Sequence, residues 1–204
     1  MTDQKAPSNW NLPNALTTLR IVMVPFFAFA LPADDGQSLV WRTVAWALFV
    51  AAMITDKIDG DIARSRNLIT NFGKIADPIA DKALTGMAFV GLSIIGELWW
   101  WVTVLVLVRE WGITALRFWV IRHGVMAAGV GDKLKTVLQT VALAALILPL
   151  RLLEDGWGDV GMVLWWVAVA VMAAAVTVTL VTGADYVVKA LAVRRDGRAG
   201  VKTP

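Results

Sequence analysis

The sequence predicts an all-α integral membrane protein with six transmembrane helices. Three observations predict this class: an apolar composition, six long apolar stretches, and connections that alternate between basic and acidic. Of the 204 residues, 58% are hydrophobic and 17% are charged, and the mean hydropathy is +0.65. Soluble domains have about 45–50% apolar and about 25% charged residues. The composition therefore excludes an ordinary soluble domain and a disordered chain, and the absence of cysteine excludes a disulfide framework.

Six stretches are long enough to cross a bilayer, which requires about 20 mainly apolar residues in a helix. The last is the clearest, because Val160 to Ala184 carries no charge. The first begins with polar residues and lacks a small-residue cleavage site after a short apolar run. We therefore expect it to be retained rather than removed as a signal peptide. The expected spans are 13–31, 39–63, 76–96, 98–122, 133–150 and 160–188.

The charges of the connections predict the orientation. The second and fourth connections and the C-terminal tail are basic, whereas the other connections are poor in lysine and arginine. The positive-inside rule then places both termini in the cytoplasm. We expect residues 1–10 to be loose or to lie on the membrane surface, 11–190 to form one six-helix domain, and 191–204 to be a basic cytoplasmic tail. The tail could contact anionic lipid or simply be a solvated end to the last helix.

Four acidic residues form two pairs at helical spacing. Asp56 and Asp59 are three residues apart, and Asp77 and Asp81 are four apart, so each pair shares one helix face. We expect residues 67–73 to form a cytoplasmic turn that makes the two helices antiparallel. The acidic faces would then converge near the cytoplasmic membrane surface, where unpaired charges are costly.

Two divalent cations would neutralise these four carboxylates. Carboxylate oxygens suit Mg²⁺, Mn²⁺ or Ca²⁺, and paired metal ions commonly serve phosphoryl chemistry. Gly60 and Ala63 lie on the same side of the helix as Asp56, and Arg64 has the forked donors that bind phosphate. The alternative is a set of helix-end salt bridges between the acids and their basic neighbours, namely Lys57, Arg64, Lys74 and Lys82.

The acidic segment resembles the signature of a known family. It reads Asp56-Lys-Ile-Asp59-Gly60-Asp-Ile-Ala63-Arg64, eight residues, then Gly73-Lys-Ile-Ala-Asp77-Pro-Ile-Ala-Asp81. The signature of the CDP-alcohol phosphotransferase family is D-x-x-D-G-x-x-A-R, eight residues, G-x-x-x-D-x-x-x-D. Every fixed position and both spacings agree. The six-helix plan and the cytoplasmic placement of the acids also fit that family.

The resemblance implies a divalent-metal-dependent phosphatidyltransferase that acts as a homodimer in the membrane. A CDP-linked lipid donates its phosphatidyl group to an alcohol, and CMP leaves. Asp81 would also be the catalytic base that takes the proton from the attacking hydroxyl. The implied ligands of two Mg²⁺ or Mn²⁺ ions are Asp56, Asp59, Asp77 and Asp81, and the implied CDP-binding residues are Asp56, Gly60, Ala63, Arg64 and Gly73.

Two further stretches resemble the members of this family that use glycerol 3-phosphate. They are residues 11–20, and residues 109–117 together with 131–136. The expected substrates are CDP-diacylglycerol and glycerol 3-phosphate, with membrane lipid as surroundings and no nucleic-acid partner. A basic pocket beside the acids would suit the acceptor's phosphate. Its candidate residues are Arg20, Arg109, Arg117, Lys133 and Lys135.

Other interpretations remain open at this point. Inositol phosphate or another alcohol could be the acceptor for the same donor chemistry. Arg109 and Glu110 could form a structural pair with another helix, because buried charges in membranes need partners. A cation transporter would also use intramembrane acids, although the sequence lacks the repeated halves common in transporters. A non-catalytic membrane scaffold would need no divalent-cation site.

Overall fold

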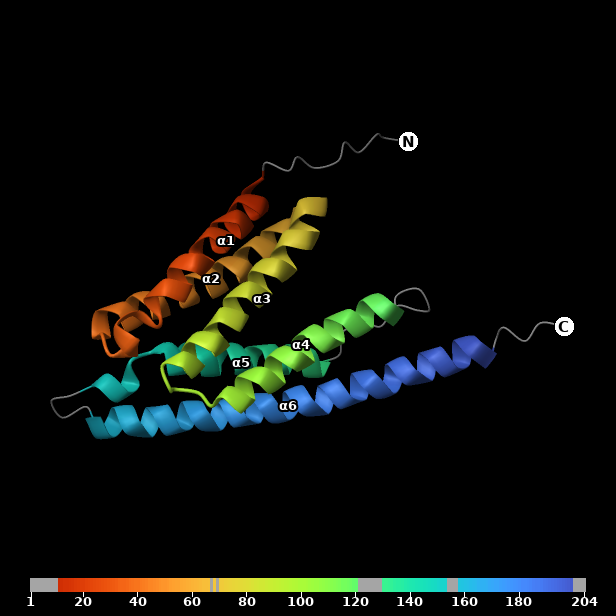
Figure 1. Ribbon diagram of the computed structural model, residues 1–204. Helices are drawn as coiled ribbons and strands as arrows, with labels where there is room; N and C mark the ends of the chain where they lie inside the picture. The colour runs from red at the N-terminus through yellow and green to blue at the C-terminus, as the bar shows by residue number, and fades with distance from the viewer. Residues whose placement is uncertain (1–10, 67, 69, 121–129, 154–157, 200–204) are drawn as a thin grey trace.

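The computed structural model describes residues 11–66, 68, 70–120, 130–153 and 158–199, and these form an all-α chain (Figure 1). Two short 3₁₀ helices, η1 (Ala33–Gly36) and η2 (Leu150–Leu152), lie in the connections. The six α-helices are α1 (Leu12–Ala30), α2 (Leu39–Ser65), α3 (Asn71–Ile94), α4 (Trp100–Val120), α5 (Val130–Ile147) and α6 (Gly158–Ala199).

Each expected span contains a helix, and four segments are long and apolar enough to cross a membrane. These segments are Leu12–Ala30, Leu39–Ser65, Lys133–Leu152 and Gly158–Val188. Helices α3 and α4 carry several ionisable residues within their length, which lowers their hydropathy. The chain is thus an integral membrane protein. That all six helices cross the membrane remains a prediction.

Two helix boundaries differ from those expected. Residues 70–73 are not a turn, because α3 begins at Asn71, five residues before the expected start of that span. The Thr70 side chain is its N-cap and accepts a hydrogen bond from the Gly73 N–H at 3.0 Å, which satisfies a backbone donor that would otherwise be free. At the other end of the chain, α6 continues to Ala199 rather than ending near residue 188. Its last residues include alanine and arginine, which favour helix.

Helix α1 lies between the two helices that carry the acids. It packs along both α2 and α3, whereas α2 and α3 have few contacts with each other. Helix α6 packs against α4 and α5. The start of α1, the end of α2 and the start of α3 come together at one end of the molecule (Figure 1). This arrangement gathers the polar parts of three helices at one place.

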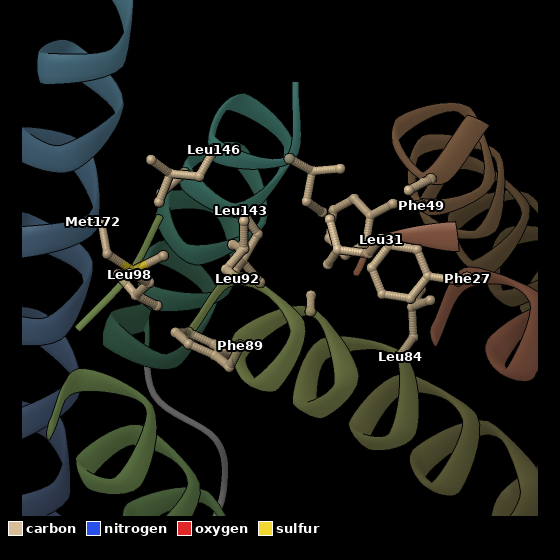
Figure 2. Close-up of a cluster of buried hydrophobic side chains, with 14 of the residues drawn as sticks. Phe27, Leu31, Phe49, Leu84, Phe89, Leu92, Leu98, Leu143, Leu146 and Met172 are labelled. Carbon is tan, nitrogen blue, oxygen red and sulfur yellow. The ribbon is translucent and has the colours of Figure 1, made fainter. Parts of the chain in front are cut away.

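An apolar core joins the helices below that end. The Phe27 and Phe49 rings lie 5.8 Å apart between α1 and α2. Leu84 on α3 and Leu143 on α5 belong to the same buried cluster (Figure 2). The outward faces are apolar as well, and Val181, for example, is 65% exposed. Such faces would be unfavourable in water and are suited to lipid.

A buried ion pair closes the opposite end of the bundle. Arg42 on α2 lies 3.2 Å from Glu97, and it donates to the carbonyl oxygens of Leu146 and Ile147 at the end of α5. The indole N–H of Trp165 donates to Glu97 at 2.6 Å. Arg42 therefore satisfies carbonyl groups that the last turn of a helix leaves without partners.

Gly161 gives the first testable prediction. A Cβ at this position would lie 2.1 Å from the carbonyl oxygen of Leu150, a backbone atom that cannot turn aside. We expect Gly161→Ala to lower the unfolding temperature by about 3–10 °C, because overpacking costs about 1–3 kcal/mol. Thermal unfolding of the protein in detergent measures this change. Gly112→Ala is the control, since, apart from its chain neighbours and the adjacent backbone of its own helix, no atom of the described residues lies within 4 Å of its added Cβ. Equal unfolding temperatures for the two variants would contradict the prediction.

Candidate active site

The four acids lie on the neighbouring ends of two helices. Asp56 and Asp59 are in the last three turns of α2, and Asp77 and Asp81 are in the first half of α3. Asp59 is buried, whereas the Asp56 side chain is 43% exposed. One carboxylate of the first pair thus faces the interior and the other reaches toward solvent.

Arg20 on α1 connects both acids of the first pair. Its Nη1 lies 2.5 Å from Asp56 Oδ1, and its Nη2 lies 2.6 Å from Asp59 Oδ2. The Arg20 side chain is fully buried. Charge-assisted hydrogen bonds of this length are strong, and they offset part of the cost of moving the charges out of water. Arg20 is therefore the counter-charge of the first acid pair.

Thr17, one turn before Arg20, reaches the second pair. Its hydroxyl donates to Asp77 Oδ1 at 2.6 Å and lies 3.4 Å from Asp59 Oδ2. A side chain of α1 thus bridges one acid of α2 and one of α3. Thr17 was not among the expected site residues. Its signal in the sequence is the spacing of three between Asn14, Thr17 and Arg20, which places polar side chains on one face of an apolar helix.

Asn14 continues this polar face and fixes the start of α3. Its Oδ1 accepts a hydrogen bond from the Thr70 hydroxyl at 2.9 Å. A Cβ on Gly73 would lie 3.2 Å from the same oxygen and 3.6 Å from Asp77 Oδ2. The absence of a side chain at Gly73 lets Asn14, Thr70 and Asp77 come close together.

Asp81 faces a pocket between α3, α4 and α5. The lining includes Lys82, Glu110, Lys135 and Gln139. Asp81 interacts electrostatically with Asp56 and Arg20, and also with Glu110 and Lys135. Asp81 thus belongs both to the acidic cluster and to the pocket that contains Glu110 of α4 and Lys135 of α5.

The acidic cluster fits a hard divalent cation by its donor chemistry, since carboxylate and hydroxyl oxygens are the ligands that such ions prefer. Asp59 is electrostatically coupled to Asp56 and to Asp77. Within the described ranges, however, no three acidic or histidine side chains form a group that could hold one ion. The guanidinium of Arg20 contacts both Asp56 and Asp59 and offsets one of their two negative charges.

The expected CDP-binding residues flank the acids. Arg64 is exposed and lies 2.8 Å from Asp61, which also points outward. A Cβ on Gly60 would lie 3.3 Å from the Arg64 guanidinium, so this side chain folds back over the glycine. Ala63 is half-buried on the same helix. The alternative of helix-end salt bridges is therefore wrong for Arg64, because this side chain pairs with Asp61 and not with one of the four acids.

The expected basic residues are divided between two places. Arg20 forms ion pairs with Asp56 and Asp59, whereas Arg109 and Lys135 both form ion pairs with Glu110. Arg109 also donates to the Thr182 hydroxyl at 2.7 Å and to the Thr179 carbonyl oxygen at 3.2 Å, both on α6. Lys133 is exposed at the start of α5. The side chain of Arg117, in α4, lies outside those that the structure describes.

The sequence profile of the CDP-alcohol phosphatidyltransferase family matches residues 10–181. The chain belongs to this family. The matched range includes α1 to α5 and most of α6, and with them all four acids and the polar face of α1. The resemblance expected from the acidic signature is thus confirmed. The family depends on divalent metal ions for phosphatidyl transfer.

Individual members of the family are similar over most of their length. A probable phosphatidylglycerophosphate synthase of Mycobacterium tuberculosis is 51% identical over 181 residues, covering 89% of this chain and 82% of the relative. The CDP-diacylglycerol–glycerol-3-phosphate 3-phosphatidyltransferase of Bacillus subtilis is 36% identical, covering 87% and 93%. The enzyme of the same name from Escherichia coli K12 is 39% identical, covering 68% and 77%.

Thr17 gives a prediction for this site. Thr17→Val keeps the shape but removes the hydroxyl that holds Asp77. We expect phosphatidyltransferase activity to fall by about ten- to a hundredfold, because a hydrogen bond to a charged group contributes about 1.5–3 kcal/mol. Release of CMP from a CDP-lipid measures the activity. Thr18→Val is the control, since the Thr18 hydroxyl donates only to the backbone oxygen of Asn14 among the hydrogen bonds described. Unchanged activity in Thr17→Val would show that the bridge is dispensable.

Proposed function

We propose that the protein transfers the phosphatidyl group of CDP-diacylglycerol to glycerol 3-phosphate, giving phosphatidylglycerophosphate and CMP. The main support is the similarity to relatives named for this activity, at 51% and 36% identity over more than four fifths of this chain. The acidic cluster on α2 and α3 supports the same reaction, since a pyrophosphate donor requires a site that can neutralise its charge.

The four carboxylates would hold the metal ions, Mg²⁺ or Mn²⁺. These residues are Asp56, Asp59, Asp77 and Asp81, whose number suits two ions. When bound, the ions would neutralise the pyrophosphate and stabilise the charge that develops on the departing CMP. Thr17 and Arg20 then serve to hold the carboxylates in place from α1.

Asp81 is the proposed base. The acceptor hydroxyl gives its proton to Asp81, and its oxygen forms a bond to the phosphorus that carries the diacylglycerol. The bond between this phosphorus and the oxygen of CMP breaks, and CMP leaves with the electron pair. The position of Asp81 in the pocket between α3, α4 and α5 supports this role, because a small alcohol could approach it there.

The nucleotide would lie along the exposed flank of α2. Gly60 and Ala63 place no large side chain beside Asp56, and the exposed Arg64, which lies over Gly60, can exchange Asp61 for a phosphate of CDP. Gly73 contributes by keeping Asn14 and Thr70 close to Asp77. These contacts follow the family signature residue by residue.

The acceptor phosphate would bind on the basic side of the pocket. Lys135 lines it and Lys133 is exposed nearby, at the start of the same helix. Arg109 supports this group through Glu110, which also contacts Lys135. Arg117 lies two turns further along α4. Arg20 is less suited to this role, since both of its terminal nitrogens bind carboxylates.

The active site and both termini would face the cytoplasm, because the basic connections adjoin the same ends of the helices as the acids. A homodimer is the assembly that the family resemblance implies. Labelling of single introduced cysteines from either side of the membrane tests the orientation. The mass of the protein in detergent tests the assembly.

The choice of acceptor is tested with purified protein, CDP-diacylglycerol and Mg²⁺. We expect CMP release with glycerol 3-phosphate, little release with inositol phosphate, and none when EDTA removes the divalent ions. A strict preference for inositol phosphate would overturn the proposed product while leaving the donor chemistry intact.

Asp77 distinguishes the transferase from a cation transporter. We expect Asp77→Asn to reduce CMP release by at least about a hundredfold, because even residues that only support a metal ligand contribute about ten- to a hundredfold. Asp34→Asn is the matched control. Asp34 lies in η1 at the opposite end with φ +56°, a conformation that asparagine tolerates. Loss of cation flux in Asp77→Asn with intact CMP release would favour the transporter.

A further inference from the structure

Arg20 combines complete burial with a pair of short ion contacts. Its side chain has no solvent exposure, and its terminal nitrogens reach Asp56 and Asp59 at 2.5 and 2.6 Å. Its remaining nitrogen, Nε, is buried and has no hydrogen-bond partner among the described residues. The favourable interactions of this guanidinium thus go to the two carboxylates that are proposed metal ligands.

The contact leaves part of each carboxylate for another ligand. Arg20 binds only Oδ1 of Asp56 and only Oδ2 of Asp59. A chelating contact to one acid would have neutralised that acid alone, whereas this arrangement divides one positive charge between two negative ones. Without Arg20, the buried carboxylate of Asp59 would lie near the like charge of Asp56 with no positive charge beside it, which is unfavourable.

We infer that Arg20 is a built-in counter-ion that holds Asp56 and Asp59 together when no divalent ion is bound, and that it shares these carboxylates with the ion when one binds. The inference rests on the proposed function for the identity of the metal ligands. It makes Arg20 a positioning residue that acts through the two acids.

The inference links stability to metal binding. An ion that binds only the folded protein stabilises it by RT ln(1 + c/Kd), where c is the free ion concentration, so tighter binding gives a larger stabilisation. Without Arg20 the acids repel each other in the metal-free protein, and a divalent ion then supplies the missing positive charge. A merely structural arginine would cause the same loss of stability with and without the ion. The dependence of the loss on Mg²⁺ therefore separates the two roles.

The experiment compares Arg20→Met with Arg42→Met in the full chain. Arg42 is the matched control, because it is equally buried and binds Glu97 at the opposite end. Unfolding temperatures are measured in EDTA and in saturating Mg²⁺. We expect Arg20→Met to unfold about 10 °C below the unmodified protein in EDTA, as for other broken buried ion pairs. In Mg²⁺ this difference should fall by at least half, whereas the difference for Arg42→Met should stay constant.

A second variant removes the buried negative charge, so that the folded protein no longer needs a positive charge at this position. In EDTA, Arg20→Met combined with Asp59→Asn should recover part of the stability lost in Arg20→Met, since no unpaired buried carboxylate remains at position 59. Arg20→Lys, which keeps the charge, should lose less than Arg20→Met and serves if the methionine variant does not fold. Additive losses in the double variant would overturn the inference.

The outcomes with Mg²⁺ also separate this inference from the proposed function. If Mg²⁺ stabilises the unmodified protein but leaves the deficit of Arg20→Met unchanged, the counter-ion role is wrong and the transferase assignment stands. If Mg²⁺ stabilises no variant while the double variant recovers stability in EDTA, Arg20 still pairs the acids. The proposed metal site then fails.

Discussion

The ion contacts of Arg20 with Asp56 and Asp59 are the constraint on which the site depends. Two carboxylates at the edge of an apolar bundle are costly unless a positive charge lies between them. The arginine that supplies it belongs to α1, which packs along both acid-bearing helices. Thr17 extends the same contact to Asp77. The acids of α2 and α3 therefore require α1 beside them, because α1 carries the positive charge and the hydroxyl that these carboxylates contact.

The acids themselves could be predicted from the sequence, because a spacing of three or four residues defines a helix face whatever the helix packs against. Their neighbours could not. The short connection between α2 and α3 suggests direct pairing of these helices, but α1 lies between them, and no local pattern specifies which helix is inserted. The start of α3 was missed for a related reason. Thr70 is an N-cap only because its hydroxyl accepts from Gly73 and donates to Asn14 on another helix.

The basic residues show the same limit. The spacing of Arg109 and Arg117 places them on one side of α4. Because a charged side chain inside a membrane is costly without a partner, the sequence also predicts that Arg109 is paired. The partners are Glu110, its neighbour in sequence, and backbone and hydroxyl oxygens of α6, which lie about seventy residues away. Close packing at Gly183 permits this contact, because a Cβ there would lie 3.2 Å from Arg109 Nε. A glycine in an apolar helix gives little indication of such a neighbour.

The separation of Arg20 from its carboxylates along the chain has a consequence for biogenesis. Arg20 leaves the ribosome 36 residues before Asp56. An arginine near the middle of a helix opposes insertion by about 2.5–3.5 kcal/mol. Helix α1 on its own thus enters lipid at a disadvantage until α2 has been synthesised. The first two helices should consequently partition from the translocon as a hairpin, with the charge neutralised before lipid surrounds it.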